Sequence, residues 1–254
     1  MTTLDRQGIG IDYSVDSEGT GTPVLFTHGF GDTGRVYGPT IAALHPARPA
    51  VSWDIRGHGR SDYPDDQGAY TPAAAVGDMV AIIDGIGAEK VILVGHSMGG
   101  FLSLDMQRRH PGRVSGLVLI GTGPGYRSDE PRAGWNAYCE STAGRLEAEG
   151  DPSGRHRSAD GLIRAARGIL PQYDSAVVDH LPDIDVPVLL IVGENDKPFL
   201  AGMSYMAKKV PDADHVIIEG AGHTPMESHP DRLAAEISRW LSRVDPVPGD
   251  SHSG

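Results

Sequence analysis

The sequence predicts an α/β fold with a mostly parallel central sheet flanked by helices, and three observations support it. Short runs of β-branched residues and leucine alternate with stretches of helical periodicity along the 254-residue chain. Several runs are apolar throughout, as in strands buried on both faces of a parallel sheet. Each of the runs at residues 24–27, 91–95 and 188–193 leads into a glycine-containing turn, which suits right-handed β-α-β crossovers.

The expected elements follow one another from the N-terminus. We expect strands at residues 9–15, 24–27, 50–55, 91–95, 117–121, 188–193 and 216–220. The first alternates apolar and polar residues, as an antiparallel strand at an exposed sheet edge does. We expect helices at about residues 37–45, 72–87, 98–110 and 231–244. Pro72 in a first turn and Pro111 beyond a last turn support two of these boundaries.

Residues 1–254 are interpreted as one domain that carries an insertion. The stretch 123–182 interrupts the strand–helix rhythm and has glycine and proline at its edges. About 60 residues bury little core alone, so this stretch is interpreted as a small helical cap and not as a second domain. Residues 245–254 are expected to form a disordered tail.

Composition limits the classes of partner. The net charge of −12 disfavours binding to nucleic acid and to anionic membranes. No apolar run approaches the roughly 18 residues of a membrane helix, and the first residues lack the pattern of a signal peptide. Cys139 is the only cysteine, which excludes an intrachain disulfide and a cysteine-based metal site. A cytoplasmic location is expected.

The segment Gly95-His96-Ser97-Met98-Gly99 matches G-x-S-x-G, a weak signal by itself. Its context strengthens it, because an expected strand precedes it and an expected helix follows, as a nucleophile elbow requires. A serine hydroxyl needs a base to become nucleophilic. Ser97 is therefore the candidate nucleophile. The alternative is a glycine-rich turn with an incidental serine.

The candidate base is His223, on the loop after the expected strand at residues 216–220. Such a loop reaches the same sheet edge as Ser97. The histidine needs an anion to fix its tautomer. Asp196 follows the strand at 188–193 and is the preferred acid, with Glu194 as its competitor.

The developing oxyanion needs donors, and main-chain N–H groups of Met98 and Phe30 are the candidates for this oxyanion hole. Because these donors belong to the backbone, the side chains remain available to shape a pocket. Trp135 and Met226, with the side chains of Phe30 and Met98, are the candidate pocket residues for an apolar substrate.

The segments VLFTHGFGDTG, DIRGHGRSD, VGHSMGG, VGENDKP and EGAGHTP occur in this order. Through them the chain resembles the α/β-hydrolase fold-1 superfamily from about residue 9 to residue 243. The resemblance implies a helical cap after the sixth strand and a catalytic triad in the order Ser, Asp, His. It also implies that the last residue of Gly193-Glu194-Asn195-Asp196 is the triad acid. Serine at the nucleophile position differs from the aspartate of haloalkane dehalogenases and epoxide hydrolases.

The expected activity is that of a serine hydrolase, which cleaves a carboxylic ester of a small or medium apolar substrate through an acyl-enzyme. No metal and no organic cofactor are expected. Carbon–carbon bond cleavage, lactone hydrolysis and thioester hydrolysis use the same triad and stay open. A ligand receptor that retains the fold is the alternative from another class. The oligomeric state is left open.

Overall fold

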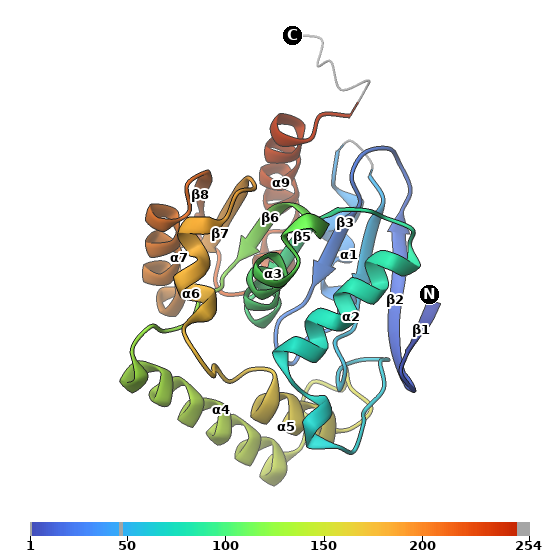
Figure 1. Ribbon diagram of the computed structural model, residues 1–254, viewed down its shortest axis with the longest axis vertical. Coiled ribbons are helices and arrows are strands. Elements are labelled where there is room, and N and C mark those ends of the chain that lie inside the picture. The colour runs from blue at the N-terminus through green and yellow to red at the C-terminus, as the bar shows by residue number, and fades with distance from the viewer. Residues whose placement is uncertain (1, 46–47, 248–254) are drawn as a thin grey trace.

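The computed structural model describes residues 2–45 and 48–247, and its centre is an eight-stranded sheet (Figure 1). The strands are β1 (Thr2–Arg6), β2 (Ile9–Ser17), β3 (Val24–Thr27), β4 (Ala50–Trp53), β5 (Val91–His96), β6 (Val114–Ile120), β7 (Val188–Gly193) and β8 (Ala213–Ile218). Their spatial order is β1-β2-β4-β3-β5-β6-β7-β8. The pairs from β4 to β8 are parallel, whereas β2 is antiparallel to both β1 and β4. The predicted fold class is confirmed.

One expectation about the sheet edge is corrected. Strand β2 was expected at the edge, but β1 pairs with it and occupies that position. Residues 2–6 read TTLDR, which has too little apolar alternation to indicate a strand. The tight turn at Gln7 and Gly8, both with positive φ, folds β1 back onto β2.

Six helices that the structure describes lie on the two faces of the sheet. They are α1 (Gly38–Ala42), α2 (Pro72–Gly85), α3 (Met98–Arg109), α7 (Lys197–Lys209), α8 (Pro225–Ser228) and α9 (Pro230–Val244). Short 3-10 turns are η1 (Gly34–Tyr37), η2 (Gln67–Ala69), η3 (Pro111–Arg113) and η4 (Leu181–Asp183). Helices α2, α3 and α7 share one core with the sheet, and α1, α8 and α9 share the other.

Strand β5 shows why the central runs are apolar throughout. Val91 and Leu93 belong to the core under α2 and α3, whereas Ile92 and Val94 belong to the core under α1 and α9. Alternate side chains of a strand point to opposite faces, so a strand covered on both sides needs an apolar residue at every position. This arrangement fixes the end of β5, and therefore Ser97, in a rigid frame.

Between β6 and β7 the chain forms α4 (Asp129–Glu149), α5 (Ala159–Gly168) and α6 (Ala176–His180). Helices α4 and α5 lie side by side, away from the sheet and at the end of the molecule opposite α9 (Figure 1). We call residues 123–182 the cap segment. The predicted insertion after the sixth strand is therefore helical, and it stands beyond the carboxyl ends of the parallel strands.

Two further observations concern the ends of the predicted elements. The helix expected at 37–45 is displaced toward the N-terminus, because η1 begins at Gly34 and α1 ends at Ala42. In the expected tail, Asp245 pairs with Arg48 and Val247 is buried, so residues 245–247 pack against the body of the protein. The remainder, 248–254, lies outside the described residues.

Among the described helices, none is long and apolar enough to cross a membrane.

Candidate active site

Ser97 occupies a strained turn between β5 and α3. Its backbone has φ 51° and ψ −116°, an uncommon conformation for a residue with a side chain. Its N–H donates to the carbonyl of Ile120 at 2.9 Å, and its carbonyl accepts from Oγ of Thr122 at 2.7 Å. Strain held by surrounding contacts is characteristic of functional residues.

The two glycines of the motif are required by close packing. A Cβ on Gly95 would lie 2.4 Å from the carbonyl oxygen of Gly99, and one on Gly99 would lie 2.2 Å from that of Thr27. Real Cβ atoms do not approach main-chain oxygens so closely, since such contacts are deep inside the repulsive range. Only glycine at both positions lets α3 begin directly beneath the end of β3.

The structure brings His223 and Asp196 together. Nδ1 of His223 lies 2.8 Å from Oδ2 of Asp196, and the side chain of Asp196 is only 3% exposed. Gly121, at the end of β6, lies under this pair, because a Cβ there would be 3.0 Å from Oδ2 of Asp196. Ile120, the residue before it, binds the N–H of Ser97. The pair therefore adjoins the serine across the end of β6.

Glu194 contacts neither the histidine nor the serine. Its Oε2 accepts the N–H of Gly220 at 2.9 Å, so this side chain ties the end of β7 to the turn after β8. Within the described residues, Oγ of Ser97 makes no hydrogen bond, including none to His223. Catalytic hydrogen bonds often form only when substrate is bound.

Two buried histidines support the loops around Ser97. Nε2 of His96 lies 2.8 Å from the carbonyl oxygen of His223. Nε2 of His28 accepts the N–H of Ile55, and its Nδ1 lies 2.7 Å from the carbonyl oxygen of Gly29. Burial lowers the pKa of both His28 and His96 to about 3. Both rings are therefore neutral at physiological pH, and they hold the loops by hydrogen bonds without charge.

The candidate oxyanion donors have free N–H groups. Within residues 2–45 and 48–247, neither the N–H of Phe30 nor that of Met98 has an acceptor. Met98 is the first residue of α3, where N–H groups lack partners inside the helix. The loop that carries Phe30 lies against the serine, since a Cβ on Gly29 would be 3.3 Å from Cβ of Ser97.

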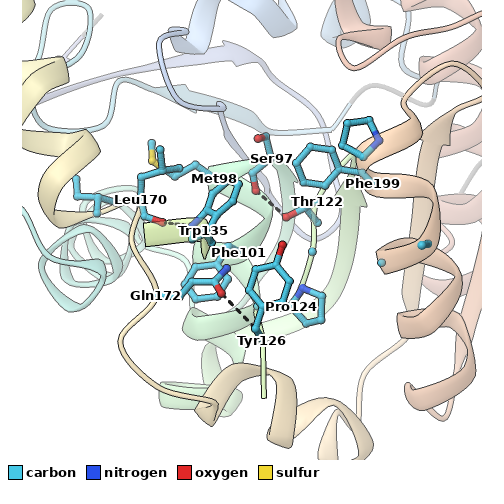
Figure 2. Close-up of a pocket in the computed structure, with 16 residues that line it drawn as sticks. Ser97, Met98, Phe101, Thr122, Pro124, Tyr126, Trp135, Leu170, Gln172 and Phe199 are labelled. Atoms are coloured by element: carbon cyan, nitrogen blue, oxygen red, sulfur yellow. Dashed lines mark hydrogen bonds between the residues drawn. The ribbon is translucent and has the colours of Figure 1, made fainter. Parts of the chain in front are cut away.

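A cavity of about 260 Å3 opens beside Ser97 (Figure 2). Its walls come from the start of α3, from the loop after β6, from the start of α7 and from the cap segment. Apart from glycines, they consist of Ser97, Met98, Phe101, Thr122, Pro124, Tyr126, Trp135, Ile169, Leu170, Gln172, Pro198, Phe199 and Ala201. None of these side chains carries a formal charge.

The cavity includes two of the candidate pocket side chains, Trp135 and Met98, but not Met226 or Phe30. Met226 is fully buried in the core shared with α1 and α9, because α8 turns its apolar residue inward. Sequence reasoning missed Phe199, whose ring stacks on that of His223 at a centroid distance of 4.7 Å. Its position three residues after Asp196 was the available signal.

The segment between α4 and α5 is bound by side-chain contacts to the loop after β3 that carries Phe30. Arg155 binds Oδ1 of Asp32 at 2.9 Å and Oε1 of Glu227 at 3.0 Å. His156 accepts the N–H of Gly59 through Nδ1, and its Nε2 lies 3.0 Å from the carbonyl oxygen of Gly31. We call residues 150–158 the strap. It joins the cap segment to the loop that positions the N–H of Phe30.

Among the described residues, no group of three or more histidine, cysteine, aspartate or glutamate side chains has the arrangement of a metal site. The groups that the structure places at this site are a serine, a histidine–carboxylate pair and main-chain N–H donors. Together these groups can perform acyl transfer through a covalent intermediate.

Comparisons with known proteins agree with this description. Residues 24–236 match the model of the alpha/beta hydrolase family. A Bacillus subtilis (strain 168) protein, provisionally named 2-succinyl-6-hydroxy-2,4-cyclohexadiene-1-carboxylate synthase, is 30% identical over 266 residues, covering 92% of this chain and 96% of that protein. The 2-(acetamidomethylene)succinate hydrolase of Mesorhizobium japonicum is 27% identical, covering 93% of this chain and 94% of its own.

A solved structure extends the likeness to three dimensions. The thermophilic esterase from Thermogutta terrifontis, determined with malate bound, superposes with a TM-score of 0.82 at 26% sequence identity. The match covers 96% of this chain and 97% of that esterase.

Proposed function

The chain is an enzyme of the α/β-hydrolase family, and on that basis we propose that it hydrolyses carboxylic esters of small, apolar substrates. The observation that carries the proposal is the 2.8 Å contact between His223 and Asp196 beside the strained turn at Ser97. The likeness to a solved esterase and the apolar cavity next to the serine support it.

In the proposed first step, Oγ of Ser97 attacks the acyl carbon while Nε2 of His223 takes the hydroxyl proton. Asp196 accepts the Nδ1–H bond, which leaves Nε2 free as the base and stabilises the imidazolium that forms. The main-chain N–H groups of Phe30 and Met98 bind the oxyanion of the tetrahedral intermediate. Collapse of that intermediate breaks the bond to the alkoxy group, which leaves as the alcohol with the proton from His223.

In the second step a water molecule attacks the acyl-enzyme and gives a proton to His223. The tetrahedral intermediate collapses, the carboxylic acid is released, and Oγ of Ser97 recovers its proton. Every proton transfer in the proposed cycle passes through Nε2 of one histidine, and the proposed reaction uses no metal or organic cofactor. The lone buried cysteine and the net charge of −12 support our inference that the enzyme works in the cytoplasm.

The test is hydrolysis of p-nitrophenyl esters of increasing acyl length by wild type and by Ser97→Ala. We expect the variant to lose on the order of 10⁴-fold or more in kcat, as nucleophile removal does in other triads. Ser204→Ala, on helix α7, is the matched control and should retain wild-type activity. An activity of Ser97→Ala within tenfold of wild type would refute the proposal.

A fluorophosphonate provides an independent test, because its phosphorus mimics the tetrahedral intermediate once a serine is attached. We expect one adduct per chain, located at Ser97 by peptide mass spectrometry. Labelling should be lost in His223→Ala, which lacks the base but keeps the serine. An adduct at another serine would reject the assigned site.

A further inference from the structure

Gln172 is a fixed hydrogen-bond donor in a cavity whose wall is mostly apolar. Its backbone is held at both polar atoms by Asn136, whose Nδ2 donates to the carbonyl at 2.9 Å and whose Oδ1 accepts the N–H at 2.9 Å. A carbonyl only accepts and a main-chain N–H only donates, so this reciprocal pair also fixes the orientation of the Asn136 amide.

The orientation of the Gln172 side chain is fixed in the same way. Its Oε1 accepts the N–H of Tyr126 at 3.2 Å, and only the oxygen of the amide can play this role. Nε2 therefore carries both side-chain protons, and within the described residues 2–45 and 48–247 this half-buried side chain offers them to no acceptor. Figure 2 shows Gln172 bonded to Tyr126 within the cavity wall.

Two of the other polar side chains of the wall are occupied, whereas the hydroxyls of Ser97 and Tyr126 make no hydrogen bond within the described residues. Nε1 of Trp135 donates to the carbonyl of Leu170 at 3.0 Å, and Oγ1 of Thr122 donates to that of Ser97. A hydroxyl hydrogen can rotate, so the Gln172 amide is the unpaired donor of this wall whose direction is fixed by its own hydrogen bond. The cavity volume of about 260 Å3 equals the volume of about nine molecules of liquid water, so the cavity can hold a chain of about that volume.

We propose that the cavity recognises an uncharged chain with one oxygen atom that accepts a hydrogen bond from Nε2 of Gln172, an inference that rests on the proposed function. An ether or carbonyl oxygen within an alkyl chain has this chemistry. A carboxylate at the same place is excluded, because an ion in an apolar cavity without a cationic partner carries a large desolvation cost. The substrate class is therefore a neutral ester with an oxygen-containing side chain.

The test measures binding to Ser97→Ala by calorimetry, so that it does not depend on turnover. One series of probes consists of methyl hexanoate and of analogues in which oxygen replaces one chain methylene; these analogues are isomers that differ in the position of the oxygen. The second series consists of butyl acetate and its analogues with the same replacement. Monomethyl adipate, which ends in a carboxylate, is the charged probe. Comparing oxygen positions within one series cancels the general loss of apolar surface.

We expect one oxygen position to bind about tenfold more tightly than its isomers, the effect of one net hydrogen bond. Gln172→Glu should abolish this preference, since a carboxylate still accepts from Tyr126 but has no donor. Gln67→Glu is the matched control, because the Gln67 amide bonds to Arg164 on the exterior. Melting temperatures of both variants verify folding.

The inference is overturned if the isomers bind alike, if Gln172→Glu keeps the preference, if monomethyl adipate binds as tightly as methyl hexanoate, or if no neutral ester binds. Failure of the proposed function is a separate outcome. In that case wild type does not hydrolyse these esters, while Ser97→Ala still distinguishes the oxygen positions in a way that depends on Gln172.

Discussion

The imidazole of His96 holds the main-chain carbonyl of His223, with 2.8 Å between Nε2 and that oxygen. His96 precedes the candidate nucleophile, and His223 carries the candidate base. His96 therefore helps to fix the position of the loop that carries His223 relative to the end of β5. Nε2 must carry the proton in this bond, because a carbonyl oxygen only accepts.

The first prediction concerns this bond. His96→Leu removes the donor and places an apolar side chain in the buried strand. We expect kcat for an activated ester to fall about tenfold, which corresponds to the free energy of about one hydrogen bond. His110→Asn, at the exposed end of α3, is the control. The role is refuted if kcat of His96→Leu stays within twofold of wild type while its melting temperature falls.

The second prediction separates the two candidate acids. Asp196→Asn keeps the shape of the side chain but removes the anion that orients His223, and loss of this anion can cost about 10⁴-fold in kcat. Glu194→Gln should cost less than tenfold, because its carboxylate binds the N–H of Gly220 instead. Steady-state kinetics of both variants on one ester decide the matter. The assignment is reversed if the glutamine variant is the inactive one.

The third prediction is a pH dependence of stability. Burial lowers the pKa of His28 to about 3 in the folded state, against an ordinary value of 6.5. The unfolded state therefore binds the extra proton below pH 6.5, so this residue contributes stability above that pH and loses it progressively toward pH 3. Between pH 7 and pH 5 the loss is about 2 kcal/mol.

His28→Gln lacks this titration, so its free energy of unfolding should fall by about 2 kcal/mol less than that of wild type over the same interval. Urea unfolding at pH 7 and pH 5 provides both values. Equal pH dependence in the two proteins would show that His28 is already protonated in the fold or remains neutral when unfolded.

The fourth prediction concerns the strap. Asp32 is 7% exposed, and burial raises the pKa of its carboxyl. Arg155→Met leaves this carboxylate without its cation, and we expect a loss of about 1 kcal/mol in stability, since half of the arginine faces solvent. Adding Asp32→Asn should restore most of it. Thermal unfolding of the three variants tests the coupling, and additive effects would exclude it.

The fold was predictable because its central strands are covered on both faces. Val91 to Val94 must all be apolar, which makes the strand visible in the sequence, and the glycines of the turn are required by main-chain contacts. Strand β1 was missed because an edge strand of polar residues has no such requirement. The pairing of Asp196 with His223 follows from loops at neighbouring strand ends.

The cavity was much less predictable than the reacting groups. Trp135 was expected and lines it, but Gln172 and Tyr126 come from irregular stretches of the cap segment that carry no periodicity or motif. Met226, which lies three residues after His223, was also a candidate pocket residue. The short helix α8 instead directs it into the core. Chain proximity to a catalytic residue does not determine the direction of a side chain.

The cavity wall is contributed by two parts of the chain. One side belongs to the sheet and to α3 and α7, where changes disturb the reacting groups. The other side, with Trp135, Leu170 and Gln172, belongs to the cap segment and does not touch Asp196 or His223. We therefore expect a directed-evolution library restricted to Trp135, Leu170 and Gln172, which leaves the strap intact, to change the preferred substrate without altering the groups at Ser97, His223 and Asp196.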